Sequence, residues 1–352
     1  MGSEHNNLQL KFYAGTGREK LKSSATESAN AATARNHAML TAYTTANGTL
    51  NKVHVTQRSD LTPEMLWLDL VYPTEQDRQW IRQAYGQELQ FIEELGEIEA
   101  SERFYRDEHG LHLHLYFLLT GGEITRNVDV GFTLSNGRLY TLRSDELPEF
   151  RSFYSQAAKN PESYGSAMAI LVGIIAAREG MMADTYERLE SELEPVSLSI
   201  FRSRSQTMPR VLESLARIED INGKARLGLL ENRRAYSSLA RSSEAAGQAE
   251  TINEILLDVD SLMTYSSFLA ERAKFLMDAA LGMINIAQNK RLNVFTVLSV
   301  ILMPPTLIAS IYGMNFRHLP ELEWYYGYPL ALVLMLIVAI GPILYLKHKG
   351  WL

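Results

Sequence analysis

Small and polar residues recur at alternating intervals of three and four near the end of the sequence. On a helix this spacing places them on one stripe, because about 3.5 residues complete a turn of a gently supercoiled helix. If several such helices surrounded an axis, the hydroxyl and amide groups would contact water or a hydrated ion, and the apolar members would act as constrictions. The same pattern also serves close helix–helix packing in membranes, so both interpretations stay open here. The stripe consists of Asn289, Leu292, Thr296, Ser299, Met303, Thr306 and Ser310.

Two uncharged segments occupy this part of the chain. No Asp, Glu, Lys or Arg occurs from Leu292 to Phe316 or from Tyr325 to Leu346. Each segment supplies the roughly 20 residues that a helix needs to cross a bilayer. One charge at the bilayer centre costs about 2.5–3.5 kcal/mol, so two such segments favour membrane spans over a pair of buried core helices. We therefore predict two transmembrane helices in a lipid bilayer.

The charges that flank the spans predict their orientation. Basic residues precede the first span at 290–291 and follow the second at 347–349, whereas the connecting loop 314–326 holds one arginine and two glutamates. The positive-inside rule then places both termini in the cytoplasm and the loop outside. The first residues also lack the basic start and apolar core of a secretory signal.

The composition excludes several classes of protein. Lys and Arg total 34 against 41 Asp and Glu, which gives a net charge of −7 over 352 residues and argues against nucleic acid as a partner. The chain has no cysteine, so disulfides, thiolate zinc sites, iron–sulfur clusters and cysteine nucleophiles are ruled out. The sequence contains no phosphate-binding loop and no serine-hydrolase elbow motif, and we expect no enzymatic activity.

The first half of the chain predicts an α/β domain. Residues 1–45 are polar and are expected to form a mobile tail, and residues 46–160 a cytoplasmic domain with a mixed sheet. Asn136-Gly137 signals a hairpin turn, and Thr74 marks the start of a helix. The strands are expected at 53–55, 66–70, 111–119, 128–134 and 138–142.

Helical composition dominates after Pro161. Residues 161–249 are expected to form cytoplasmic helices, one of them over about 166–193, with interruptions at Pro195, at Pro209 and at 246–247. A helix as long as the one expected from residue 250 onward needs lateral partners, for which further copies of the chain are the obvious source. The remaining segments are a stalk helix at 250–313 that continues into the first span at about 293–313, an external loop at 314–326, the second span at 327–346 and a basic cytoplasmic C-terminus at 347–352.

Two histidines offer a weaker signal for metal binding. His112 and His114 alternate within a predicted strand and so share one face of it. No third ligand follows at a clear spacing, and an ordinary strand surface or interface accounts for the pair better than a metal site does.

A short motif, Tyr312-Gly313-Met314-Asn315-Phe316, follows the polar stripe at the outer end of the penultimate span. It resembles the Gly-Met-Asn signature of the CorA family of magnesium transporters. The likeness continues through Pro320-Glu321-Leu322, Trp324, Gly327-Tyr328-Pro329 and the basic C-terminus 347–352, and reaches upstream through 98–101 and 131–134. Leu319 departs from the Met that many members have before Pro-Glu-Leu, but the position stays apolar.

The resemblance implies a funnel-shaped homopentamer that takes Mg²⁺, and also Co²⁺ and Ni²⁺, across the inner membrane. It places a selectivity entrance at Gly313, Met314 and Asn315, whose amide and carbonyl oxygens could receive a hydrated ion without stripping its water. Asn289 would form a second polar ring, Leu292 and Met303 a hydrophobic gate, and Phe295 either a further gate residue or a packing residue. Thr296, Ser299, Thr306 and Ser310 would complete the pore lining.

The resemblance also implies regulation by cytoplasmic Mg²⁺ bound between subunits. Glu97 takes the position of one carboxylate, and Glu254 or Asp258 on the long helix takes the other; Glu321 lies in the external loop. An exposed acidic surface is the competing interpretation of Glu97, Glu254 and Asp258. Two other functions stay open at this point: a Zn²⁺ transporter of a related branch, which could be coupled to protons, and a cytoplasmic sensor that the two spans merely anchor.

Overall fold

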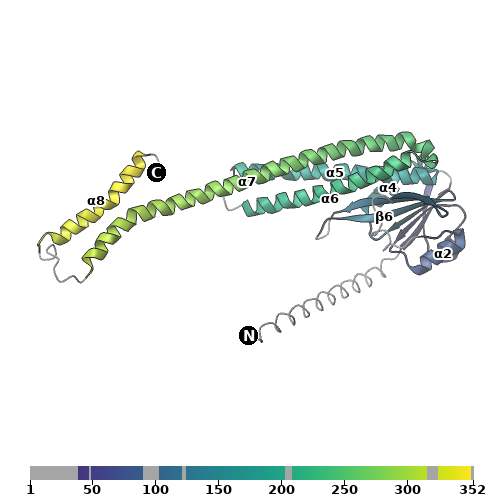
Figure 1. Ribbon diagram of the computed structural model, residues 1–352. Helices are drawn as coiled ribbons and strands as arrows, with labels where there is room; N and C mark the ends of the chain where they lie inside the picture. The colour runs from purple at the N-terminus through teal and green to yellow at the C-terminus, as the bar shows by residue number, and fades with distance from the viewer. Residues whose placement is uncertain are drawn as a thin grey trace, which may run out of the picture. The chain divides into compact units, whose positions relative to one another are not determined.

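The structure, a computed structural model, describes residues 39–46, 49–89, 103–120, 124–202, 208–314 and 324–349. The chain divides into two compact units. The first comprises Met1–Pro195 and Ala216–Ala273, and the second comprises Val196–Leu215 and Lys274–Leu352. The longest helix, α7, begins in the first unit and ends in the second (Figure 1).

A seven-stranded mixed sheet forms the centre of the first unit. Its strands stand in the order β2-β1-β3-β7-β6-β5-β4. Only β3 and β7 pair in parallel among the described strands, and the other neighbours are antiparallel. This confirms the predicted mixed sheet. The strands are β1 Met39–Ala46, β2 Thr49–His54, β3 Met65–Val71, β4 Phe104–Asp107, β5 Gly110–Leu119, β6 Arg126–Ser135 and β7 Arg138–Arg143.

Side chains alternate between the two faces of the sheet and build two apolar layers. Leu68, Leu70 and Leu142 join Ile81 of α2 (Glu75–Tyr85) on one face. The opposite face is aromatic, because Trp67 meets Phe150 and Phe153 of α4 (Pro148–Lys159), and Phe150 also contacts Phe117 and Phe132. The sheet is thereby buried on both faces.

The local signals in the sequence are confirmed where turns and caps are concerned. Thr74 caps α2 through a reciprocal capping box with Asp77. Asn136 and Gly137 both have positive φ, 49° and 74°, as the two-residue turn of a right-twisted hairpin requires.

The prediction of a tail over 1–45 is wrong for residues 39–45. These residues belong to β1, which pairs with both β2 and β3. Threonine and alanine make up much of the strand, so its apolar alternation is faint; Leu40 and Ala42 pack in the layer that includes Ile81, and Tyr43 stacks on Trp67. The rest of the predicted tail, residues 1–38, lies outside the described residues.

Three long helices follow the sheet: α5 Ala167–Arg202, α6 Met208–Ala240 and α7 Ala249–Tyr312. Within the first unit, Arg217 of α6 pairs with Glu192 of α5, Arg233 of α6 pairs with Asp260 of α7, and Tyr265 of α7 donates to Glu190 of α5. These contacts hold the three helices side by side (Figure 1). The short 3-10 helices at Pro161–Tyr164 and Ser243–Gln248 precede α5 and α7.

The predicted interruption at Pro195 is wrong, because α5 continues through it to Arg202. Pro195 lies on the exposed side of the helix, where the backbone carbonyl that loses its partner can reach water. The other two predicted breaks are confirmed, since α6 begins at Met208 and the short helix Ser243–Gln248 separates α6 from α7.

Two side chains fasten the helices to the edge of the sheet. Beyond Leu113, β5 has no described strand on the side of β4, so its backbone groups there need other partners. Asn232 of α6 accepts from Tyr116 N at 2.8 Å and donates to Tyr116 O at 2.9 Å, as a neighbouring strand would. Arg178 of α5 donates from Nε to the same carbonyl at 3.0 Å.

Candidate ion pathway

The polar stripe lies on the last part of α7, within the second unit. The helix is unbroken over its 64 residues, about 96 Å at the usual rise. Every stripe residue from Asn289 to Ser310 is exposed, and so is Phe295 beside it. In this single chain the stripe is therefore an open surface.

The face of α7 opposite the stripe is partly covered. Its half-buried residues include Val297, Ile301, Pro304 and Ile308, which lie about 100–160° around the helix from Met303. The second apolar helix, α8 (Gly327–His348), folds back toward this end of α7 and has its own covered face, which begins with the buried Gly327 and Ala331 (Figure 1). The half-buried residues in this part of α7 are therefore all different from the seven residues of the predicted stripe.

The stripe threonines present oxygen acceptors to their surroundings. Thr296 Oγ1 donates to Leu292 O at 3.0 Å, and Thr306 Oγ1 donates to Leu302 O at 2.7 Å. A hydroxyl that donates its hydrogen to a backbone carbonyl can still accept hydrogen bonds through its lone pairs. Such oxygens suit the hydrogens of a hydrated cation better than they suit an anion.

Two polar residues that the sequence reasoning missed lie on the same stripe. The spacing of three and four continues from Asn289 down α7 through Asn285 and Gly282 to Asp278, and both Asn285 and Asp278 are exposed. Extending the heptad beyond the uncharged segment would have found them. Asn285 adds a further amide, and Asp278 places a carboxylate on the stripe before the first span begins.

Gly313 and Met314 end α7, and Asn315 lies outside the described residues. Gly313 N donates to Ala309 O at 2.9 Å, which continues the helical pattern. Gly313 does not have positive φ, so the backbone makes no left-handed turn at this residue. A Cβ here would lie 3.2 Å from Ala309 O, so close packing is what favours glycine.

The three predicted regulatory carboxylates are only partly visible. Glu254 and Asp258 are exposed on the first part of α7, one turn apart, and no described residue forms an ion pair with either. Glu97 and Glu321 lie outside the described residues. Within the described part of the chain, no group of three or more histidine or acidic side chains is placed to hold a metal ion.

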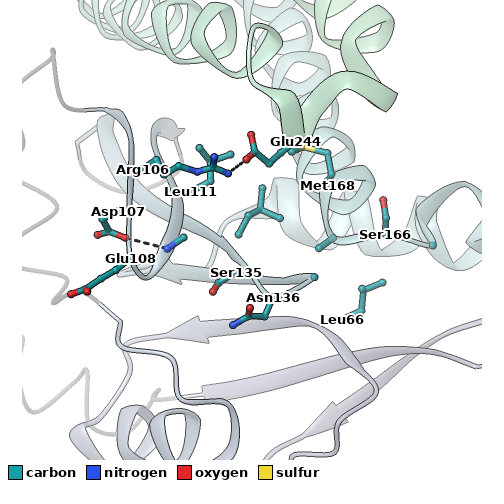
Figure 2. A pocket seen from close by; sticks show the side chains of 15 residues that line it. Leu66, Arg106, Asp107, Glu108, Leu111, Ser135, Asn136, Ser166, Met168 and Glu244 are labelled. Carbon is teal, nitrogen blue, oxygen red and sulfur yellow. Dashed lines mark hydrogen bonds and ion pairs between the residues drawn. The ribbon is translucent and has the colours of Figure 1, made fainter.

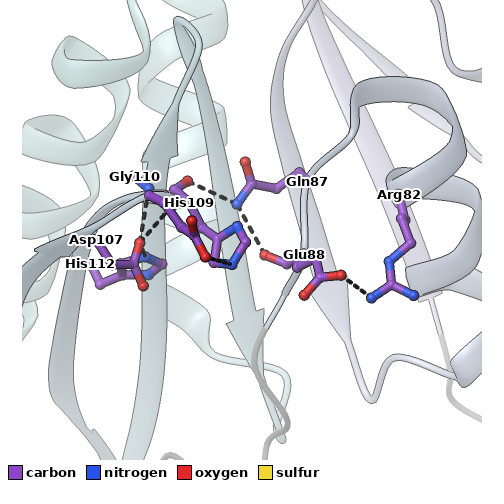
Figure 3. Close-up of polar contacts among 8 residues, drawn as sticks. Arg82, Gln87, Glu88, Asp107, His109, Gly110 and His112 are labelled. Carbon is purple, nitrogen blue, oxygen red and sulfur yellow. Dashed lines mark hydrogen bonds and ion pairs between the residues drawn. The ribbon is translucent and has the colours of Figure 1, made fainter.

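His112 and His114 are both buried. Figure 3 shows His112 beside Asp107. His112 Nε2 contacts Asp107 Oδ1 at 2.9 Å, and its Nδ1 contacts Thr133 Oγ1 at 3.1 Å. Burial, with smaller contributions from His112 and Arg103, lowers the pKa of His114 to about 4. Asp107 also accepts from the backbone of the hairpin turn that follows it, so its carboxylate is already occupied.

A cavity of about 660 Å³ lies at one end of the sheet, where two hairpin turns meet the start of α5 (Figure 2). Arg106 and Glu244 form an ion pair in its lining, and Glu108 lies 3.7 Å from His109. With Asp107 bound to its own turn, each carboxylate among the described lining residues already has a protein partner. The cavity is not a ready metal site.

The chain is similar to known proteins over most of its length. Residues 63–348 match the family described as CorA-like Mg²⁺ transporter protein. The chain is 40% identical to the magnesium transport protein CorA of Pectobacterium atrosepticum and 39% identical to that of Escherichia coli, in each case over 89% of this chain and 100% of the relative.

Solved structures share the fold at lower identity. The complete CorA magnesium transporter of Methanocaldococcus jannaschii aligns with a TM-score of 0.71 at 19% identity, over 90% of this chain and 98% of that one. The full-length CmaX protein aligns with a TM-score of 0.64 at 18% identity, over 89% of this chain and 98% of that one.

Proposed function

The chain belongs to the CorA family of Mg²⁺ transporters, and from this membership we propose that it moves Mg²⁺ across a membrane through a pore lined by the stripe of α7. Its curated relatives are named magnesium transport proteins and match over their full length. Proteins of this kind are transporters and not enzymes.

The position of the stripe relative to the covered face of α7 carries the proposal. The half-buried residues of α7 lie on the other side of the helix, so the polar side is left open in the single chain. Asn, Ser and Thr in a membrane helix face a neighbouring helix or water. A purely anchoring helix has no use for a polar stripe that extends from Asp278 to Ser310.

A single helix cannot surround an ion, so several copies must supply the stripe. We propose a homopentamer in which α7 lines the axis and α8 faces the lipid bilayer. The outward residues of α8, including Leu332, Leu336 and Leu344, are exposed in the single chain and are suited to acyl chains.

Neutral oxygens suit Mg²⁺ in this pore because the ion gives up its water reluctantly. The lone pairs of Thr296 and Thr306, with the amides of Asn289 and Asn315, would accept hydrogen bonds from the water shell. Carboxylates inside the span would hold a divalent ion too firmly for rapid release, and the stripe carboxylate, Asp278, comes before the span. Co²⁺ and Ni²⁺ are octahedral divalent ions as well, and we propose that they pass by the same route.

The membrane orientation follows from the ends of α8. Trp324, Tyr325 and Tyr326 precede the helix, Lys347 lies in its last turn and Lys349 follows it, as aromatic and basic residues do at membrane interfaces. We propose an inner-membrane protein with both termini in the cytoplasm. An inside-negative potential then drives uptake with about 4.6 kcal/mol per divalent ion at 100 mV.

Regulation by cytoplasmic Mg²⁺ is the most detailed part of the proposal. The carboxylates of Glu254 and Asp258 are exposed and lie one turn apart on α7. We propose that they and Glu97 of an adjacent subunit repel one another until a divalent ion bridges them, which favours a closed state.

Mg²⁺ uptake into proteoliposomes tests the function. The wild-type chain should take up Mg²⁺ in proportion to an inside-negative potential, and Asn315→Ala should lose uptake while still assembling. Normal uptake by assembled Asn315→Ala would contradict the entrance. Zn²⁺ flux without Mg²⁺ flux would favour the related branch, and no flux of either ion would favour a membrane-anchored sensor.

A further inference from the structure

A second cavity in the first unit is not used by the transport pathway. It has a volume of about 300 Å³ and lies beside β1 and α4. Its lining combines buried charges, exposed cations and aromatic rings. The residues that matter here are Tyr43, Lys52, Asp69, Arg143, Arg151 and Tyr154.

The buried charges of this cavity neutralise each other. Arg143 donates from Nε to Asp69 Oδ1 at 3.0 Å and from NH2 to Asp69 Oδ2 at 2.7 Å. Thr141 adds a third hydrogen bond to Asp69 at 2.7 Å. Asp69 is therefore satisfied and does not offer a free carboxylate to a cation.

The remaining charges of the lining favour an anion. Lys52 and Arg151 are exposed, and no described residue pairs with either. Glu146 is the only other charged group among the described lining residues, so one positive charge is in excess. Arginine and lysine side chains without protein partners are the usual ligands of phosphate oxygens.

The hydroxyl of Tyr43 adds an unused hydrogen-bonding group. Tyr43 is only 5% exposed, and its ring stacks on Trp67 with centroids 4.1 Å apart. No hydrogen bond among the described residues uses its hydroxyl, and this hydroxyl is not one of the fully buried atoms that lack a partner, so it is accessible from the cavity that Tyr43 lines. Burial first, and the charge of Asp69 second, raise the pKa of Tyr43, so the hydroxyl stays protonated and can donate.

We infer that this cavity binds a phosphate ester carried on a flat ring, the chemistry of a nucleoside monophosphate. Lys52 and Arg151 meet the phosphate at the exposed side, and the Tyr43 hydroxyl donates to an oxygen of the ligand. Tyr154, which is half-buried and whose ring lies 5.5 Å from that of Tyr43 between centroids, supplies the aromatic surface for the ring. The volume is at the lower end for ligand sites, which fits one ring and one phosphate.

Calorimetric titration of the full-length protein in detergent tests this inference, with adenosine monophosphate as the probe. Adenosine and inorganic phosphate are titrated separately. Adenosine monophosphate should bind saturably below about 1 mM and more tightly than either part. No saturable binding, or equal binding of phosphate alone or adenosine alone, would overturn the inference.

Two variants locate the binding. Arg151→Gln removes an exposed charge, and Tyr43→Phe removes the hydroxyl but keeps the stack on Trp67. Each should weaken binding of adenosine monophosphate about tenfold. Lys159→Gln, an exposed residue of α4 outside the lining, is the matched control and should bind as the wild type does. Unchanged affinity in both Arg151→Gln and Tyr43→Phe would show that the ligand binds elsewhere.

Discussion

Acidification should loosen the sheet through His114, because this side chain is buried without a partner for its charged form. His114 is 1% exposed, and its Nδ1 has no hydrogen-bond partner among the described residues. Arg103 and His112 lie near enough to oppose a further positive charge, and burial lowers the pKa from 6.5 to about 4. The group charges more readily in the unfolded chain, so its contribution is complete above pH 6.5 and is lost as the pH falls towards 4.

The magnitude follows from these two pKa values. Between pH 7.5 and pH 5.0 the free energy of unfolding should fall by about 2 kcal/mol through this group, and by about 3 kcal/mol well below pH 4. Hydrogen–deuterium exchange of the β5 amides in the full-length protein, corrected for the intrinsic rate at each pH, measures the local free energy directly.

His114→Leu separates this effect from general acid sensitivity. The variant keeps a buried side chain of similar size but cannot charge, so it should lose about 2 kcal/mol less than the wild type between the two pH values. His109→Gln, on the exposed hairpin turn, should behave as the wild type. If His114→Leu loses as much protection as the wild type, the acid sensitivity comes from other groups.

Three further changes test other parts of the structure. Asn232→Ala should cost about 1–3 kcal/mol of unfolding free energy in a denaturant titration, because it leaves Tyr116 N unpaired; an unchanged midpoint would mean that water replaces the amide. Leu292→Asp and Met303→Asp should raise leak current in bilayer recordings by wetting an apolar constriction, and unchanged leak in both would mean that these residues face neighbouring helices. Neutralising Glu97, Glu254 and Asp258 together should weaken inhibition of current by internal Mg²⁺ without changing ion selectivity, and an unaltered Mg²⁺ dependence would place the sensor elsewhere.

Sequence patterns predicted those elements whose signals are local. Thr74, Asn136 and Gly137 carry their conformations in their own chemistry, and the uncharged segments needed only a count of residues. β1 was not predicted because its Thr and Ala residues give no clear alternation. The strand forms by pairing with β2 and β3, which no local sequence pattern shows. The predicted break at Pro195 was wrong because a helix tolerates proline where the freed carbonyl faces water, and which side faces water depends on how the helices pack.

The candidate pathway divides in the same way. The spacing of the stripe was visible in the sequence, but its separation from the half-buried face of α7 was not. Asn285 and Asp278 were not predicted because they precede the uncharged segment that marks the span. The second cavity, beside β1 and α4, is lined by residues from several strands and α4, so no sequence motif could have indicated it.

A cysteine scan along α7 tests the central claim, that the stripe lines the ion pathway. The chain has no native cysteine, so single substitutions can be labelled without background. In reconstituted protein, a charged, water-soluble thiol reagent should modify Ser299→Cys, Met303→Cys and Thr306→Cys and block Mg²⁺ uptake. Val294→Cys and Leu298→Cys, exposed in the single chain but off the stripe, should remain unmodified with uptake intact. Equal labelling on both faces, or block of uptake from the second set alone, would contradict the account.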